Sequence, residues 1–229
     1  MVVSIVGLGL IGGSIAKDLM NGQLFSLVIG VDNNQDHAKK ALVNELVNEI
    51  KGFEEAIKLS DLIVLAVPVD AAEKLVIKIL DHKSHPVIMD VGSTKSKILE
   101  AVKDHPNRSN FVATHPMSGT ENSGPDAAIA NLFEDKLAII CDAENSGEEA
   151  LTIVKSVYQQ LGSKVKYMNP IEHDASAAYV SHISHISSFA LALTVLETEK
   201  NKEGEAVHSR TRQSIHSEMS DAPQRTIMS

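Results

Sequence analysis

The stretch that decides the fold lies at the start of the chain, where Val2-Val3-Ser4-Ile5-Val6 runs directly into Gly7-Leu8-Gly9-Leu10-Ile11-Gly12. A short apolar run followed by this glycine pattern is typical of a strand, a tight turn and a helix that together bind a dinucleotide. Gly7 permits the turn, Gly9 lets the backbone approach a pyrophosphate, and Gly12 lets helix and strand pack closely. We therefore predict that all six residues of the pattern bind a cofactor, with the pyrophosphate at the positive N-terminus of the helix.

A carboxylate follows the glycine pattern at the spacing that a ribose contact requires. Asp32 ends the second apolar run, 20 residues after Gly12, where its side chain can accept a hydrogen bond from a ribose 2′-hydroxyl. Asn33 and Asn34 come next, and no arginine stands there to hold a 2′-phosphate. The pattern therefore favours NAD over NADP as the cofactor.

Short apolar runs alternate with amphipathic segments as far as residue 168. The runs are rich in Val and Ile, as strands are when helices cover both faces of a parallel sheet. Between them, the stretch 71–80 carries its apolar residues at helical spacing. We predict an α/β fold, a doubly wound Rossmann-type dinucleotide-binding domain over residues 1–168. Its predicted strands are Val2–Val6, Leu27–Val31, Leu62–Val67, Val87–Val91, Phe111–Thr114, Leu137–Cys141 and Val165–Met168.

The character of the sequence changes at residue 169. Asn169-Pro170-Ile171-Glu172 combines an N-cap residue, a proline at the first helical position and a glutamate at the third, which predicts a helix start. No helix breaker follows before about Lys200, and residues 189–196 are apolar nearly all round. Such a helix must be buried on every side. We therefore expect residues 169–200 to begin an all-α domain, truncated here, that packs against a further helix or a second subunit.

Composition and charge narrow the classes of function. A chain of 229 residues that is 43% hydrophobic and 22% charged fits a folded protein of one domain or slightly more. Its net charge of −9 argues against a nucleic-acid partner. The longest apolar stretch, 189–196, falls far short of the roughly 20 residues that a membrane span needs. With no basic region before the first apolar run and a single cysteine, Cys141, we expect no signal peptide and a cytoplasmic protein.

Three further segments follow predicted strands, whose carboxyl ends meet at one edge of a parallel sheet. Ala66, Val67 and Pro68 end one strand and would face the cofactor. Ser93 lies in Val-Gly-Ser-Thr-Lys (91–95), and His115 lies in Thr-His-Pro-Met-Ser-Gly-Thr-Glu (114–121). Ligands of open α/β sheets bind beyond these strand ends, so Ser93 and His115 can reach the nicotinamide end. A histidine before proline at a strand end equally suits a structural role, and the residues alone leave both roles open for His115.

Two histidines lie on one face of the predicted C-terminal helix. His182 and His185 stand three residues apart in Ser-His-Ile-Ser-His (181–185). Burying such groups unpaired costs about 1–3 kcal/mol each, so they line a substrate pocket, pair within a core or interface, or ligate a metal. No carboxylate or cysteine accompanies them at metal-ligand spacing, and we predict no metal site. His173 and Asp174 fall on roughly the opposite face, so we do not expect them to join this site.

Taken in order, the glycine pattern, Val-Gly-Ser-Thr-Lys, His-Pro-Met-Ser-Gly-Thr-Glu and His-Asp followed by Ser-His-Ile-Ser-His resemble the prephenate dehydrogenase family in its monofunctional bacterial form. The resemblance runs from Met1 to about Lys200. Related arogenate dehydrogenases share the same architecture. The resemblance implies a two-domain fold in which helices after the Rossmann domain build the substrate site and a homodimer.

The resemblance also implies an activity, the NAD-dependent oxidative decarboxylation of prephenate to 4-hydroxyphenylpyruvate in tyrosine biosynthesis. It assigns His115 as the acceptor of the 4-hydroxyl proton, a task that an ordinary histidine pKa of about 6.5 suits at neutral pH. Ser93 would hydrogen-bond the same hydroxyl and the nicotinamide, and His182, His185 and Glu121 would bind the substrate. Two alternatives stand beside this activity: arogenate as the substrate, or a protein that binds NAD without turning over.

The last part of the chain departs from the family pattern. In the family, further helices follow, and an arginine in a Thr-Arg segment grips a substrate carboxylate. Here Arg212 follows Thr211, but its neighbours are polar, as is most of the tail 201–229, which we expect to be disordered or weakly helical. We hypothesise that this tail is an aberrant end, produced by a shifted reading frame, an alternative terminus or cloning, and that it impairs catalysis.

The coding DNA tests this hypothesis directly. If the reading frame shifts near the codon for Lys200, one of the other two frames should encode an apolar, helix-forming continuation with a Thr-Arg pair. Sequencing the gene and translating all three frames is sufficient. A polar or interrupted translation in both other frames would contradict the frameshift.

Overall fold

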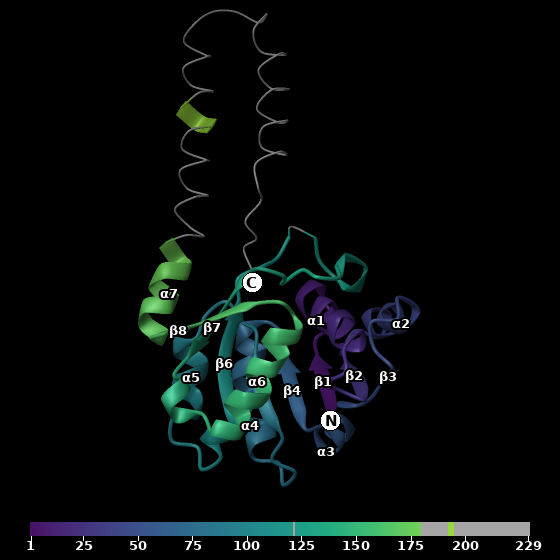
Figure 1. Cartoon of the computed structure of the whole chain (residues 1–229), viewed down its shortest axis with the longest axis horizontal. Helices are drawn as coiled ribbons and strands as arrows, with labels where there is room; N and C mark the ends of the chain where they lie inside the picture. Colours follow the sequence, from purple (N-terminus) through teal and green to yellow (C-terminus); the bar gives the residue numbers. More distant parts are fainter. Residues whose placement is uncertain (121, 180–191, 195–229) are drawn as a thin grey trace, which may run out of the picture.

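Eight strands form a single sheet in the order β3-β2-β1-β4-β5-β6-β7-β8 (Figure 1). The computed structural model describes residues 1–120, 122–179 and 192–194. Neighbouring strands pair in parallel throughout, except that β6 and β7 are antiparallel. The strands are β1 (Val2–Val6), β2 (Leu27–Val31), β3 (Glu49–Ile50), β4 (Leu62–Leu65), β5 (Val87–Asp90), β6 (Phe111–Pro116), β7 (Leu137–Cys141) and β8 (Lys164–Met168).

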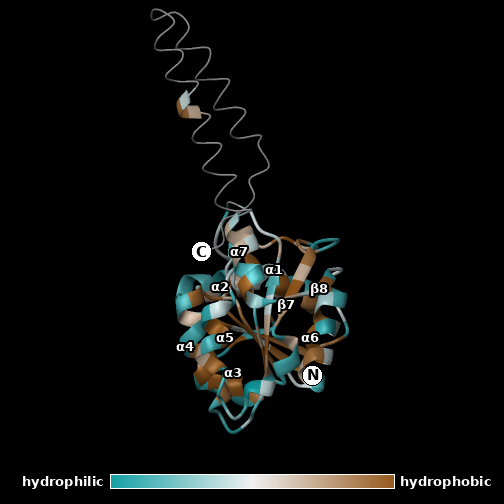
Figure 2. Cartoon of the chain, turned by 90° about the vertical axis from the view of Figure 1, so that its left-hand side faces the viewer, coloured by the Kyte–Doolittle hydropathy of each residue, from teal (hydrophilic) through white to brown (hydrophobic). Residues whose placement is uncertain are grey.

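Helices cover both faces of this sheet, which explains why its strands are apolar without alternation. Successive residues of one strand enter opposite cores; in β4, for example, Val64 packs on one face and Ile63 on the other. The first face is covered by α1 (Leu10–Met20), α2 (Gln35–Val43) and α6 (Glu148–Gln160), and the second by α3 (Phe53–Leu59), α4 (Val69–Leu80) and α5 (Ser96–Val102). Figure 2 shows hydrophobic residues concentrated along the strands and inner helix faces. The predicted doubly wound Rossmann-type fold is confirmed.

The sheet departs from prediction at two places, in one additional strand and in the direction of another. The strand β3 has only two residues and was not predicted, because so short a run carries no hydrophobic period. The strand β7 runs antiparallel to β6, since the described residues of the connection 117–136 hold no α-helix that could carry the chain across for parallel pairing. This pairing also extends β6 to Pro116, so that His115 lies inside the strand, opposite Ile139.

After the last strand the chain enters α7 (Pro170–Ala178), whose predicted start is confirmed. The side chain of Asn169 accepts hydrogen bonds from the backbone N–H groups of Ile171 and Glu172, as an N-cap residue does. Figure 1 places α7 beside α5 at one side of the sheet. The expected continuation to Lys200 and the tail 201–229 lie outside the described residues, apart from 192–194. Within the described part of the chain, no helix is long and apolar enough to cross a membrane.

Candidate dinucleotide site and its histidine cluster

The glycine pattern forms the turn between β1 and α1, and its three glycines have different surroundings. Gly7 has φ +94°, a conformation that other residues rarely adopt. A Cβ on Gly12 would lie 1.9 Å from the carbonyl oxygen of Gly7, so only glycine fits where helix and strand cross. A Cβ on Gly9 would meet nothing within 4 Å. The loop is thus closely packed on the protein side and open at Gly9, where a pyrophosphate would approach the helix N-terminus.

Two neighbouring strand ends hold this loop in place. The Asp32 carboxylate, at the end of β2, accepts hydrogen bonds from the backbone N–H of Leu8 (2.8 Å) and of Asn34 (2.8 Å). Ala66 and Val67, which follow β4, lie directly against Gly7 and Gly12. Because a carboxylate has about four acceptor positions, Asp32 retains capacity for a ribose hydroxyl while it fixes the loop. The structure therefore brings together Asp32, Ala66, Val67 and the glycine pattern, as predicted; Pro68 follows as an exposed residue.

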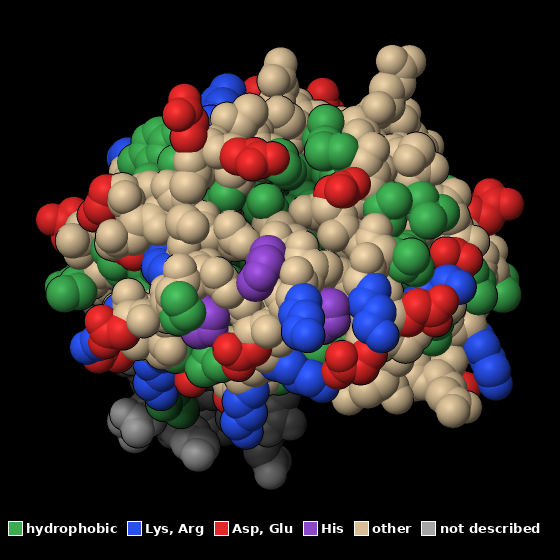
Figure 3. Space-filling model, turned by 90° about the horizontal axis from the view of Figure 1, so that it is seen from below, with side chains coloured by type: hydrophobic (Ala, Val, Ile, Leu, Met, Phe, Trp, Pro, Cys, Tyr) green, Lys and Arg blue, Asp and Glu red, His purple; other side chains and the backbone are tan. Residues whose placement is uncertain are grey.

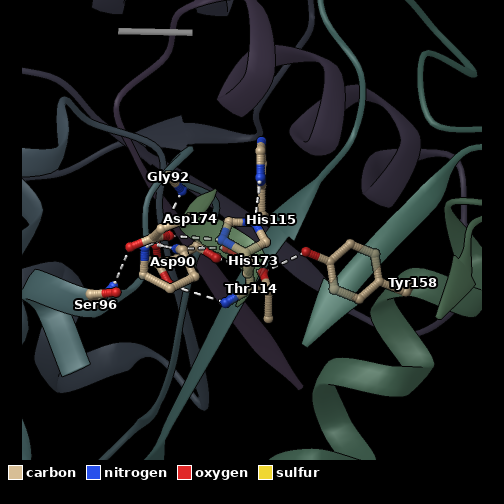
Figure 4. A network of polar contacts seen from close by, with 9 residues as sticks. Asp90, Gly92, Ser96, Thr114, His115, Tyr158, His173 and Asp174 are labelled. Atoms are coloured by element: carbon tan, nitrogen blue, oxygen red, sulfur yellow. Dashed lines mark hydrogen bonds and ion pairs between the residues drawn. The ribbon is translucent and has the colours of Figure 1, made fainter. Parts of the chain in front are cut away.

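A buried polar network joins the ends of β5 and β6. Lys95, which is fully buried, forms an ion pair with Asp90 and donates a hydrogen bond to the carbonyl of Thr114 (2.7 Å). The Asp90 carboxylate accepts from the backbone N–H of Thr114 (3.1 Å), and Tyr158 of α6 bonds the Thr114 hydroxyl. Figure 4 shows Tyr158 reaching Thr114 from the side opposite the histidines. This network attaches the 92–95 loop, which carries Ser93, to the strand that carries His115.

His115 is paired with a second histidine that comes from α7. The Nδ1 atom of His115 lies 2.9 Å from Nε2 of His173, and Nδ1 of His173 lies 2.8 Å from the Asp174 carboxylate (Figure 4). Asp174 also accepts hydrogen bonds from the backbone N–H groups of Lys95 (2.7 Å) and Ser96 (2.8 Å). Both histidines are buried, at 6% and 2% exposure. His173 and Asp174 were expected to lie apart from the site of His182 and His185, and in the structure they pair with the predicted catalytic histidine.

The pKa of His115 differs from the ordinary histidine value that was expected. Burial, with the nearby cation Lys95 and with His173, lowers the pKa of His115 to about 3, although Asp174 acts in the opposite direction. Burial also opposes ionisation of Asp174, but the hydrogen bonds from Ser96, His173 and Lys95 together outweigh it and lower the carboxyl pKa. At neutral pH, His115 is therefore a neutral imidazole and Asp174 is a carboxylate. Because its pKa is so low, His115 on its own is a weaker base than an ordinary histidine.

The segment after His115 crosses the carboxyl edge of the sheet to the dinucleotide loop. Its far end is attached to α1, where the backbone N–H of Ile129 donates to Ser14 (2.9 Å), and to α2, where Asp126 pairs with Lys40. The predicted substrate residue Glu121 belongs to this segment but lies outside the described residues, as do His182 and His185 of the C-terminal part. Their predicted roles stay predictions.

The carboxyl ends of β1, β4, β5 and β6 therefore carry the glycine pattern, the Ala66–Val67 turn, Ser93 and His115 at one edge. Three strand spacings separate β1 from β6, about 14 Å. A dinucleotide in this fold lies across the point where the strand order reverses, here between β1 and β4. Fold and loop geometry together define a dinucleotide-binding domain of the dehydrogenase type.

Comparison with known proteins identifies the family. The nucleotide-binding domain of prephenate dehydrogenase matches residues 15–167, and the chain belongs to this family. A prephenate dehydrogenase of Bacillus subtilis is 31% identical over 195 residues, which is 82% of this chain and 52% of that protein. In backbone, the chain is similar to the prephenate dehydrogenase of Aquifex aeolicus in complex with hydroxyphenyl propionate and NAD+ (TM-score 0.77, 31% identity, 86% of this chain and 70% of that one).

The chain is similar in the same way to the arogenate dehydrogenase of Synechocystis (TM-score 0.75, 30% identity, 90% of this chain and 76% of that one). It spans about half the length of the Bacillus subtilis protein and about three quarters of the Synechocystis chain. The resemblance seen in the motifs is confirmed at the level of the family.

Gly9 and Gly12, the second and third glycines of the pattern, should respond differently to replacement by alanine. Gly12→Ala places a Cβ against the Gly7 carbonyl and should lower the unfolding temperature by several degrees, since overpacking costs about 1–3 kcal/mol. Gly9→Ala meets no protein atom and should keep the wild-type unfolding temperature while weakening NAD+ binding about tenfold or more. Thermal unfolding and calorimetric titration with NAD+ measure both. Equal NAD+ affinity for Gly9→Ala and wild type would remove Gly9 from the binding site.

The lowered pKa of His115 should also make stability depend on pH. Between about pH 6 and 4 the unfolded chain binds a proton at this histidine and the folded chain does not, so stability falls on acidification. His115→Gln should reduce the slope of unfolding free energy against pH by up to one proton, about 1.4 kcal/mol per pH unit. Urea unfolding at several pH values measures it. Parallel slopes for the two proteins would show that His115 titrates normally.

Proposed function

We propose that this chain catalyses the NAD-dependent oxidative decarboxylation of prephenate to 4-hydroxyphenylpyruvate, a step of tyrosine biosynthesis. The observation that carries the proposal is the position of His115, a neutral buried imidazole at the same sheet edge as the glycine loop. Membership of the prephenate dehydrogenase family supports it. So does the ligand pair of the Aquifex aeolicus relative, NAD+ and a phenol with a carboxylate side chain.

The described residues fit NAD+. The backbone from Gly7 to Gly12 would receive the pyrophosphate at Gly9, the position that is open in the structure. Asp32 would accept from the adenosine ribose, and Ala66 and Val67 would lie along the dinucleotide beside the loop. Bound NAD+ supplies the hydride acceptor of the reaction. The residues after Asp32 are Asn33 and Asn34, which offer no cation to a 2′-phosphate and support NAD over NADP.

His115 would accept the proton of the substrate 4-hydroxyl as the C4 hydride departs and the ring carboxylate leaves as CO2. Aromatisation of the ring favours the reaction, so the chain mainly has to position C4 and remove one proton. Ser93, in the loop attached to β6 through Lys95, would orient the same hydroxyl. Glu121, His182 and His185 would bind the rest of the substrate.

Arogenate is the second candidate substrate, favoured by the similarity to the Synechocystis arogenate dehydrogenase. Prephenate and arogenate differ only in a keto or amino group on the side chain, remote from C4. The chemistry assigned to His115 and Ser93 is the same for both. The choice between them therefore depends on the residues around the side chain of the substrate.

For the wider organisation, we propose that the residues from 169 onward begin a helical domain that completes the substrate site and forms a homodimer, and that the protein acts in the cytoplasm. The sheet ends at Met168, and α7 already contributes His173 to the site. The one cysteine, Cys141, is buried and unpaired, which suits a reducing compartment.

NADH formation followed at 340 nm, with NAD+ and either prephenate or arogenate, tests the activity. His115→Asn should lower kcat by about 10²–10⁴-fold and leave the Kd for NAD+ within about threefold. His105→Asn is the matched control. His105 precedes β6 and pairs with Asp81 at the opposite edge of the sheet, so this variant should retain wild-type turnover.

Each outcome separates the hypotheses. Undiminished turnover by His115→Asn would remove His115 from the mechanism. Binding of NAD+ by the wild-type chain without turnover of either substrate would favour the alternative of a protein that only binds the dinucleotide.

A further inference from the structure

One cluster in the described part of the chain has no part in dinucleotide binding, and the family resemblance includes its His-Asp motif (173–174) without implying a role for it. It is the Asp174–His173 pair, which enters the site from α7 and bonds His115 from the side of α5. A buried histidine needs partners for both ring nitrogens or it loses about 1–3 kcal/mol. His173 has both: its Nδ1 faces a carboxylate oxygen and its Nε2 faces Nδ1 of His115.

The donor and acceptor roles in this row of three hydrogen-bonded side chains follow from Asp174, at its end. Asp174 is ionised, so its oxygens can only accept hydrogen bonds. The Nδ1 atom of His173 must therefore carry a proton. If this is the only ring proton of His173, its Nε2 atom is an acceptor and the neighbouring Nδ1 of His115 donates to it. A neutral His115 with its proton on Nδ1 has its lone pair on Nε2.

We propose that Asp174, acting through His173, positions His115 with its Nε2 atom unprotonated and stabilises the charge that His115 acquires when it takes the substrate proton. Asp174 and His173 are positioning residues, and the inference rests on the proposed function of His115 as proton acceptor. The substrate hydroxyl proton bonds to Nε2, and the Nδ1 proton of His115 can then move to Nε2 of His173. The positive charge comes to lie beside the Asp174 carboxylate.

The charges around His115 explain why such support is needed. From the loop before α5, the Lys95 ammonium faces the site, although Asp90 pairs with it; from α7, His173 and Asp174 face it. Burial and Lys95 both disfavour a second positive charge at this place. Asp174 is the group among these that favours one. A carboxylate connected through one imidazole supplies this compensation without contacting the substrate.

The geometry also explains why the carboxylate keeps its place. Asp174 accepts from the backbone N–H groups of Lys95 and Ser96, at the start of α5. These two bonds fix the carboxylate relative to the loop that carries Ser93. The side chain that orients His173 thus also helps to hold the loop that carries Ser93.

The tautomer can be measured directly on the full-length wild-type protein. Histidine side-chain nitrogen NMR at neutral pH, assigned with His115→Gln and His173→Gln, should show His115 protonated at Nδ1 and unprotonated at Nε2. His173 should be protonated at Nδ1. A spectrum with the His115 proton on Nε2 would overturn the inference, and this measurement needs no substrate and no altered carboxylate.

The second test uses Asp174→Asn with Asp81→Asn as the matched control, because Asp81 also bonds a histidine, His105, but at the opposite edge. Asp174→Asn should lower kcat about 10²–10⁴-fold, as loss of a tautomer-fixing carboxylate does. Its KM and NAD+ affinity should stay within about threefold. Its remaining turnover should rise with pH, since hydroxide must then take the proton. Asp81→Asn should match wild type in kcat and in pH profile.

The outcomes distinguish the inference from the proposed function. Suppose that the wild type turns over and shows the expected tautomer. If a folded Asp174→Asn protein then keeps the wild-type kcat and pH profile, the positioning role alone is overturned. Absence of turnover in the wild type with either substrate would overturn the proposed function, while the tautomer measurement would still decide the hydrogen-bond order. If Asp174→Asn does not fold, the wild-type tautomer decides the inference.

Discussion

Parallel pairing of β1, β4, β5 and β6 is the constraint on which the site depends. It brings the carboxyl ends of four strands, separated by as many as about 110 residues in the chain, to one edge of the sheet. Each end then contributes one short segment to the site. The register Val6↔Leu65 and Leu65↔Asp90 places the glycine loop, the Ala66–Val67 turn and the Asp90 carboxylate at the same level. A slip of one residue would turn these side chains to the other face.

The buried ion pair of Asp90 and Lys95 shows how charge is used at this edge. Removing two charges from water is costly, and a buried pair is weak grounds for stability. This pair has a geometric effect, because Lys95 also bonds the carbonyl of Thr114 and so attaches one loop to the next strand. The same ammonium adds to burial, the larger cause, in lowering the pKa of His115. One cation therefore anchors the loop and helps to keep the imidazole neutral.

Much of this fold could be predicted from the sequence, because its signals are local. Runs of Val and Ile mark the buried strands, and Asn169-Pro170 marks a helix start. Gly12 is required by a contact with Gly7 five residues away. The short strand β3 and the antiparallel β7 could not be predicted in this way. Their pairing depends on connections rather than on the composition of the strands.

The site could be predicted only where its residues follow a strand end. Ser93 and His115 were found because motif and strand end coincide. His173 was missed because its contact with His115 spans 58 residues and depends on where α7 packs. Helical spacing relates His173 only to the other histidines of the same predicted helix, and not to a residue of the sheet. The available signal was the pair of a histidine and an aspartate at the start of an otherwise apolar helix, which calls for a buried polar partner.

The contact between His173 and His115 links the sheet domain, which ends at Met168, to the helical part that follows it. The sheet ends at Met168 and the family match ends at residue 167, yet the hydrogen bonds to His115 and to the start of α5 come from residues 173 and 174. A nucleotide-binding domain cut at Met168 would keep the glycine loop and Asp32, but His115 would lose its partner and Asp174 its hold on the Ser93 loop. Under the proposed function, binding of the dinucleotide would be independent of the helical part. The proton acceptance proposed for His115 would instead depend on its contact with α7, although His115 itself belongs to the sheet.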